Sequence, residues 1–111
     1  MNETIIKKRV LKISSHEEED GTFVVNIEGW FDTTTSIQAK RDMEILNDKL
    51  DHNILLDLTG LKYISSSGLR QFLLLLKDTR SHGGSLSITG LSDYLCQVFN
   101  DVGFSKLFNI I

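Results

Sequence analysis

LLDLTGLKYISSSG, residues 55–68, is the stretch that decides the fold of this 111-residue chain. An apolar run at residues 54–58 opens it; this run is too short for a typical globular helix and is followed by Gly60. Such a run is typical of a strand buried on both faces of a sheet. Three serines and Gly68 come next, and apolar residues then recur at helical spacing from Leu69 to Leu76. The stretch therefore predicts a buried strand, a connection, and a helix whose N-terminus carries the serines.

A helix that begins at these serines presents backbone N–H groups without intrahelical partners, together with the positive end of its dipole. An anion, or a phosphate attached to a serine, would be stabilised at such a helix end. The residues alone leave two interpretations open. Either Ser65, Ser66 or Ser67 is simply an N-cap, or Ser66 is a phosphorylation switch. Serine is common at N-caps, so residue patterns alone favour the cap.

Hydrophobic periodicity predicts the other strands. Apolar and polar residues alternate at residues 9–15, 23–28 and 85–89, and residues 107–111 can add a final strand. A charged turn that ends at Gly21 joins the first two strands as a hairpin. After residue 50 the predicted order is strand, helix, strand, helix and strand, which favours an α/β layer with parallel pairings. The hairpin makes the sheet mixed.

Two further helices are predicted. The first is capped by Thr34 or Thr35 and places four apolar residues on one face, namely Ala39, Met43, Leu46 and Leu50. The last follows Ser92, has Leu91, Leu95, Val98 and Val102 on one face, and ends at Gly103. In the helix after Ser66, Leu74 and Leu75 lie off the core stripe on opposite flanks. We favour a helix packed between neighbours; the alternative is a protein-binding face beside Ser66.

The order and spacing of these motifs resemble the STAS domain, the fold of bacterial anti-sigma factor antagonists. DLTGLKYISSSGLR, residues 57–70, is similar to the family signature, in which Asp-x-Ser-Gly ends a strand and Asp-Ser-Ser-Gly-Leu opens a helix. Gly29-Trp30-Phe31-Asp32 resembles the family's Gly-Glu-hydrophobic-Asp turn. Residues 82–86 resemble the glycine turn after the second helix, and residues 91–111 resemble the family's ending. The resemblance implies a single STAS domain over residues 1–111, an α/β fold with a mixed sheet of about five strands and three or more helices.

Matched residue by residue, the resemblance places Ser66 on the serine that the family's switch kinase phosphorylates, and Ser67 on the serine after it. Ser65 stands where the family usually has an acidic residue. The resemblance also implies a partner-binding surface, for which we expect Asp32, Ser65, Ser67, Gly68, Leu69 and Phe72. For Asp32 the alternative is a helix cap, and for Asp57 we favour a structural role in the turn after its strand.

The implied function is that of an anti-sigma factor antagonist that regulates sigma-factor-dependent transcription. The unmodified chain would bind an anti-sigma factor that is also a serine kinase, phosphorylation of Ser66 would break the complex, and a serine phosphatase would restore it. Ser65 in place of the acidic residue keeps an alternative open, a STAS scaffold or subunit of a signalling complex or transporter without phosphorylation. A small-ligand sensor is a third alternative.

Other classes of protein lack support in the sequence. Gly-x-Ser-x-Gly and Gly-x-x-x-x-Gly-Lys-Ser/Thr motifs are missing, and the three histidines are scattered through predicted turns, so we expect neither catalysis nor a cofactor. Cys96 is the single cysteine and metal-ligand spacings are missing, so we expect no disulfide and no metal. The formal charge of −3, with Lys7-Lys8-Arg9 as the only basic run, argues against nucleic acid. No apolar segment has transmembrane length, and we expect a cytoplasmic protein.

Overall fold

The computed structural model describes residues 9–111, so Lys7 and Lys8 of the basic run lie outside the described residues. Its strands are β1 (Leu11–Glu17), β2 (Phe23–Phe31), β3 (Asn53–Asp57), β4 (Leu61–Ile64), β5 (Ser85–Thr89) and β6 (Asn109–Ile110). Its helices are α1 (Ser36–Asp42), α2 (Ser66–Ser81) and α3 (Asp93–Asp101), with 3₁₀-helices at Met43–Leu46 and Phe104–Lys106. The mixed α/β fold agrees with the prediction.

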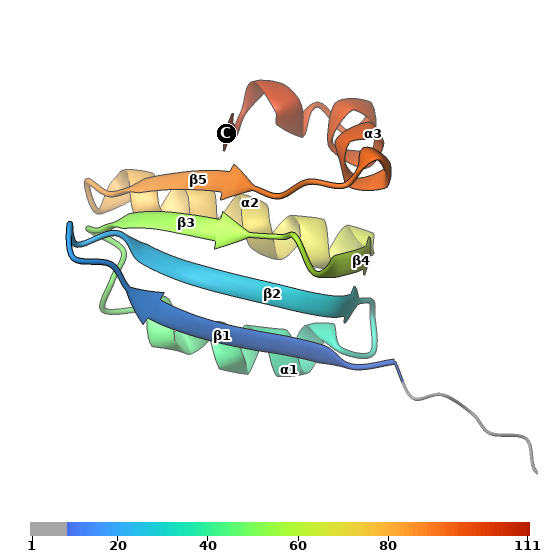
Figure 1. Ribbon diagram of the computed structural model, residues 1–111, viewed down its shortest axis with the longest axis horizontal. Helices are drawn as coiled ribbons and strands as arrows, with labels where there is room; N and C mark the ends of the chain where they lie inside the picture. The colour runs from blue at the N-terminus through green and yellow to red at the C-terminus, as the bar shows by residue number, and fades with distance from the viewer. Residues whose placement is uncertain (1–8) are drawn as a thin grey trace, which may run out of the picture.

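The six strands form one mixed sheet in the order β1-β2-β3-β5-β6, with β4 paired to the end of β2 (Figure 1). The predicted hairpin is present as the antiparallel β1–β2 pair, and every other pairing is parallel. β2 pairs with β3 over residues 23–26 and then with β4 from Gly29 onward, with a register shift between Gly29 and Trp30. β2 therefore pairs with two different strands, one after the other along its length.

Helices α1 and α2 lie on the same face of the sheet and run side by side (Figure 1). Alternate residues of the central strands are buried beneath them, including Val25, Ile27, Ile54, Leu56 and Ile88. This alternation is the pattern of a sheet with one covered face, so the strand that was predicted to be buried on both faces is buried on one, and Leu55 on its other face is only partly buried. Because β2 and β4 are parallel, both helices begin at the same edge of the sheet. The N–H of Ser65 donates to the Phe31 carbonyl at 2.7 Å, which joins the two connections.

Both predicted ends of the last helix, the start after Ser92 and the stop at Gly103, are confirmed. Ser92 caps α3, since its Oγ accepts the N–H of Leu95 at 3.1 Å. Gly103 has φ +80° directly after that helix, the left-handed conformation that glycine adopts without steric cost. The predicted stripe of α3 differs in one position, because Phe99 is fully buried while Val102 is half exposed.

Two local predictions were incomplete. The helix predicted as far as Leu50 is α-helical only to Asp42 and continues as a 3₁₀-helix, a common way for the last turn to tighten. Strand β4 was not predicted, because a four-residue segment that contains Lys62 has no period of its own. It becomes a strand because the end of β2 extends past β3 and offers backbone groups that need partners.

Candidate functional site

The three consecutive serines have different roles at the start of α2. Ser65 is the N-cap: its backbone is extended (φ −87°, ψ 171°) and its Oγ accepts the N–H of Gly68 at 3.3 Å. Ser67 is half-buried, with its Oγ 2.8 Å from the Oγ of Ser65. Ser66 is exposed at the first helical position, and its hydroxyl has no hydrogen-bond partner within residues 9–111. The cap interpretation therefore applies to Ser65, and Ser66 is left open to solvent.

Asp32 organises the neighbouring loop between β2 and α1. Its Oδ1 accepts the backbone N–H groups of Thr34 and Thr35, both at 2.9 Å. The hydroxyl of Thr35 donates to the Trp30 carbonyl at 2.7 Å and accepts the N–H of Asp32 at 3.0 Å. Free N–H groups before α1 are thus satisfied by a carboxylate, whereas Thr35, the expected capping residue, makes no side-chain cap bond. Asp32 fills the structural role that the sequence left as its alternative.

These bonds change the acidity of Asp32. The N–H of Thr35 is the largest cause that lowers the pKa of the Asp32 carboxyl below its ordinary value of 3.8. A lowered pKa means that the folded state favours the ionised carboxylate. The resulting stabilisation is present above pH 3.8 and is lost as the pH falls through this value toward the folded-state pKa.

We expect Asp32→Asn to flatten this part of the pH dependence. Asparagine can accept the same two N–H bonds but does not titrate, so its free energy of unfolding should fall less than the wild type's between about pH 4 and pH 2. Chemical denaturation at several pH values checks this. Asp20 and Asp51 also have lowered pKa values, but both are present in both proteins, so the difference isolates Asp32. If the free energies of unfolding of Asp32→Asn and the wild type fell by equal amounts with pH, the lowered pKa of Asp32 would be contradicted.

Three of the expected partner-binding residues are buried. Phe72 has no exposed surface and packs edge-to-face on Phe31, with 5.6 Å between ring centroids. Leu69 is almost completely buried in the same core. A Cβ added to Gly68 would lie 2.8 Å from Ile64 Cγ1 and 2.9 Å from the Phe31 ring, so this glycine allows α2 to approach the sheet. Direct partner contact by these three residues stays a prediction, and in the described fold the sheet covers their side of α2.

Asp57 holds the turn after β3. Its Oδ1 accepts the N–H of Thr59 at 3.0 Å and the Thr59 hydroxyl at 2.6 Å. The structural role that the sequence favoured for Asp57 agrees with these bonds. Residues 9–111 contain no group of three potential metal ligands and no helix long and apolar enough to cross a bilayer.

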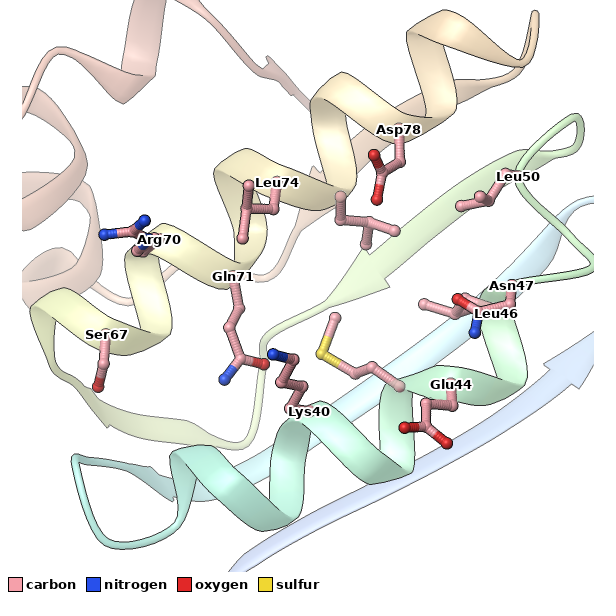
Figure 2. Close-up of a pocket in the computed structure, with 12 residues that line it drawn as sticks. Lys40, Glu44, Leu46, Asn47, Leu50, Ser67, Arg70, Gln71, Leu74 and Asp78 are labelled. Carbon is pink, nitrogen blue, oxygen red and sulfur yellow. The ribbon is translucent and has the colours of Figure 1, made fainter.

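A groove of about 470 Å³, here called the α1–α2 groove, lies beside the serines between α2 and a wall that runs from the end of α1 through the 3₁₀-helix Met43–Leu46 to Leu50 (Figure 2). The amide of Gln71 crosses between the two helices and donates to the Ser36 carbonyl at 2.7 Å. Polar and charged side chains lie along the groove, namely Lys40, Glu44, Asn47, Ser67, Arg70, Gln71 and Asp78. Its apolar lining comes from Met43, Leu46, Leu50, Leu74 and Leu75.

Leu74 and Leu75, which the sequence analysis placed together off the core stripe, differ in their exposure. Leu75 is 7% exposed and belongs to the core, whereas Leu74 is 47% exposed at the groove. The charged lining residues were missed. A signal for them exists in the sequence, since Arg70, Leu74 and Asp78 follow one another at a spacing of four and so share one side of a helix.

The STAS domain family profile matches residues 14–111, nearly the whole described chain. The chain belongs to the STAS domain family.

Among the STAS relatives, a candidate anti-sigma factor antagonist of Bordetella bronchiseptica, BtrV, is 32% identical over 91 residues, which cover 82% of this chain and 78% of the relative. The anti-sigma-B factor antagonist of Listeria monocytogenes is 28% identical over 100 residues, covering 90% and 88%. The solved structure of phosphorylated SpoIIAA from Bacillus has the same fold, with a TM-score of 0.67 at 16% identity and coverage of 90% and 91%. The fold and the family thus agree with the sequence motifs.

Proposed function

We propose that this STAS domain is an anti-sigma factor antagonist controlled by phosphorylation of Ser66. Unmodified, it binds a cytoplasmic anti-sigma factor that is also a serine kinase, and it thereby releases the sigma factor for transcription. Phosphorylation of Ser66 breaks the complex, and a serine phosphatase restores the binding form. The names of the relatives from Bordetella and Listeria support the antagonist role, and the SpoIIAA structure supports a phosphorylated state in this fold.

The observation that carries the proposal is the difference among the three serines. Ser65 is engaged as the N-cap and Ser67 is hydrogen-bonded to it, whereas Ser66 is exposed with its hydroxyl unengaged within residues 9–111. A kinase can reach this hydroxyl without unfolding the helix. Ser65 also performs the capping that an acidic residue would perform at this position, so the departure from the family signature leaves the local backbone intact.

The physical effect of the phosphate acts at an interface rather than on the fold. Phosphorylation adds between about one and a half and two negative charges, together with three acceptor oxygens. At the N-terminus of α2 this charge is favourable by roughly 0.3–1 kcal/mol within the domain itself. A partner that covers Ser66 must instead bury or repel the charge, which is costly unless a cation meets it. Binding is therefore lost while the domain stays folded.

We expect Ser66→Asp to weaken binding to the purified kinase-type anti-sigma factor of the same organism at least tenfold, or about 1.4 kcal/mol. Isothermal titration calorimetry on the full chain measures the change. Ser66→Ala should bind like the wild type and should take up no phosphate when the kinase and ATP are added. Ser14→Asp introduces the same charge at an exposed position of β1, far along the chain from α2, and should have little effect.

Three results would decide against this function. Unchanged affinity of Ser66→Asp would contradict Ser66 as the residue that controls binding. A phosphate mapped by mass spectrometry to Ser65 or Ser67 would assign the control to that serine instead. A chain that stays unmodified and does not bind the anti-sigma factor would favour the fixed scaffold or transporter subunit instead.

A further inference from the structure

The charges of the α1–α2 groove are ordered along its length. Because both helices begin at the same edge of the sheet, Lys40 and Arg70 lie nearer the serines than Glu44 and Asp78 (Figure 2). None of these four side chains forms an ion pair within residues 9–111. The groove therefore has a basic end beside Ser67 and an acidic end one to two helical turns away.

This order of charges does not serve the stability of α2. Asp78 lies in the last turn of the helix, where the dipole favours cations, whereas Arg70 lies just past the first turn, where the effect of the dipole is small. Asp78 is therefore not placed where it would stabilise the helix. The four groups are also solvent-facing, so their fields reach a molecule that docks in the groove.

The lining between the charged ends is apolar and open. Leu74 is 47% exposed at its centre, and Met43 and Leu50 are half-buried against the core. A groove between two helices with an exposed leucine at its centre fits the apolar face of an amphipathic segment. The charged ends then select the direction in which that segment lies.

We propose that the groove binds an amphipathic segment of the anti-sigma factor, with an acidic end beside Lys40 and Arg70 and a basic end beside Glu44 and Asp78. This inference rests on the proposed function and gives its partner a stated chemistry. The apolar side chains of the segment cover Leu74. The groove begins at Ser67, so a partner in it is adjacent to the phosphorylated residue.

The same geometry couples the groove to phosphorylation. Ser66 and Arg70 are four residues apart on α2, so their side chains are neighbours on the helix surface. A phosphate on Ser66 pairs with Arg70, because side chains in helices lean toward the N-terminus. Arg70 is then withdrawn from the acidic end of the partner segment, which meets the phosphate instead. Phosphorylation thus cancels most of the positive charge of Lys40 and Arg70 at the basic end of the groove, the end that meets the acidic end of the partner segment.

The test is a charge exchange that keeps the composition of the groove. The double variant Arg70→Asp and Asp78→Arg retains the net charge of −3 and reverses the polarity of α2. Its stability should stay close to that of the wild type, because Asp78→Arg follows the helix dipole in the last turn and offsets the weaker helix propensity of aspartate at position 70. We expect its affinity for the anti-sigma factor to fall at least tenfold in calorimetry. Leu74→Ser, which leaves the charges in place, should lower the affinity by a similar factor.

A matched exchange on the other face of the sheet controls for charge rearrangement. Lys12 and Glu28 are directly opposite each other in the β1–β2 pair and both are exposed, so Lys12→Glu with Glu28→Lys should leave the affinity unchanged. Unaltered binding by the Arg70–Asp78 exchange, with binding still lost in Ser66→Asp, would overturn the groove proposal and leave the switch intact. No binding by the wild type would overturn both. Loss of self-association by the exchange, with anti-sigma binding unaltered, would assign the groove to a second copy of the chain.

Discussion

Replacing Phe72 by alanine is expected to lower the free energy of unfolding by about 3–5 kcal/mol, as for other fully buried aromatic residues. Phe72 has no exposed surface and packs edge-to-face on Phe31, the last residue of β2. Its removal leaves a cavity between α2 and the sheet, which the backbone of two regular elements can close only in part. Urea denaturation followed by circular dichroism measures the change.

Leu74→Ala on the same helix is the control for this variant. Leu74 is half exposed, so its truncation removes little buried surface and should lower the free energy of unfolding by well under half the Phe72→Ala value. A Phe72→Ala protein that stays as stable as the wild type would contradict the placement of the ring in the core. If Phe72→Ala binds the anti-sigma factor less well, the loss should match its unfolded fraction, because the side chain offers no surface to a partner.

Replacing Gly29 by alanine is expected to cost more than about 2 kcal/mol of stability, the sum of backbone strain and overpacking. Gly29 has φ +99°, a conformation that side-chain-bearing residues avoid, and an added Cβ would clash with the Val10 carbonyl oxygen. That neighbour is backbone and cannot rotate away. Gly29 is also the point at which β2 begins to pair with β4, so the strain falls on the strand end that leads to Asp32.

Gly21→Ala separates the two causes. Gly21 has a similar φ of +89°, but nothing lies within 4 Å of its added Cβ, so only the conformational cost of about 1–2 kcal/mol applies. Thermal unfolding of both variants with the wild type measures the difference. Equal losses for the two variants would show that β1 moves aside at Val10 and that the close approach carries no cost.

The site was predicted from the sequence in its position but not in its details. A strand, three serines and a helical stripe placed Ser66 at a helix N-terminus, and the structure has it there. Which serine caps the helix depends on the extended backbone of Ser65 and its bond to Phe31, a contact between residues more than thirty positions apart. The groove was missed for the same reason, since its two walls come from different segments of the chain.

The leucines of α2 show that a sequence pattern does not predict how far the flanks of a helix are buried. The periodicity of α2 identifies a face, but it does not state which neighbours cover the flanks of that face. The structure buries Leu75 in the core and leaves Leu74 47% exposed, although both leucines line the α1–α2 groove. The partner-contact role expected for Phe72 stays a prediction, and in the described fold its ring packs on Phe31 of the sheet.

The amino-acid sequence by itself determined the order of the elements apart from β4, the hairpin, the presence of the central strand, the glycine at the end of α3 and the position of Ser66. These depend on local periodicity and on single-residue backbone preferences, which a short window contains. Only the tertiary structure decided that residues 61–64 form β4 and that Lys40, Arg70, Glu44 and Asp78 share a groove. The physical reason is that each of these requires a partner supplied by a distant segment, and the partner exists only once the sheet has assembled.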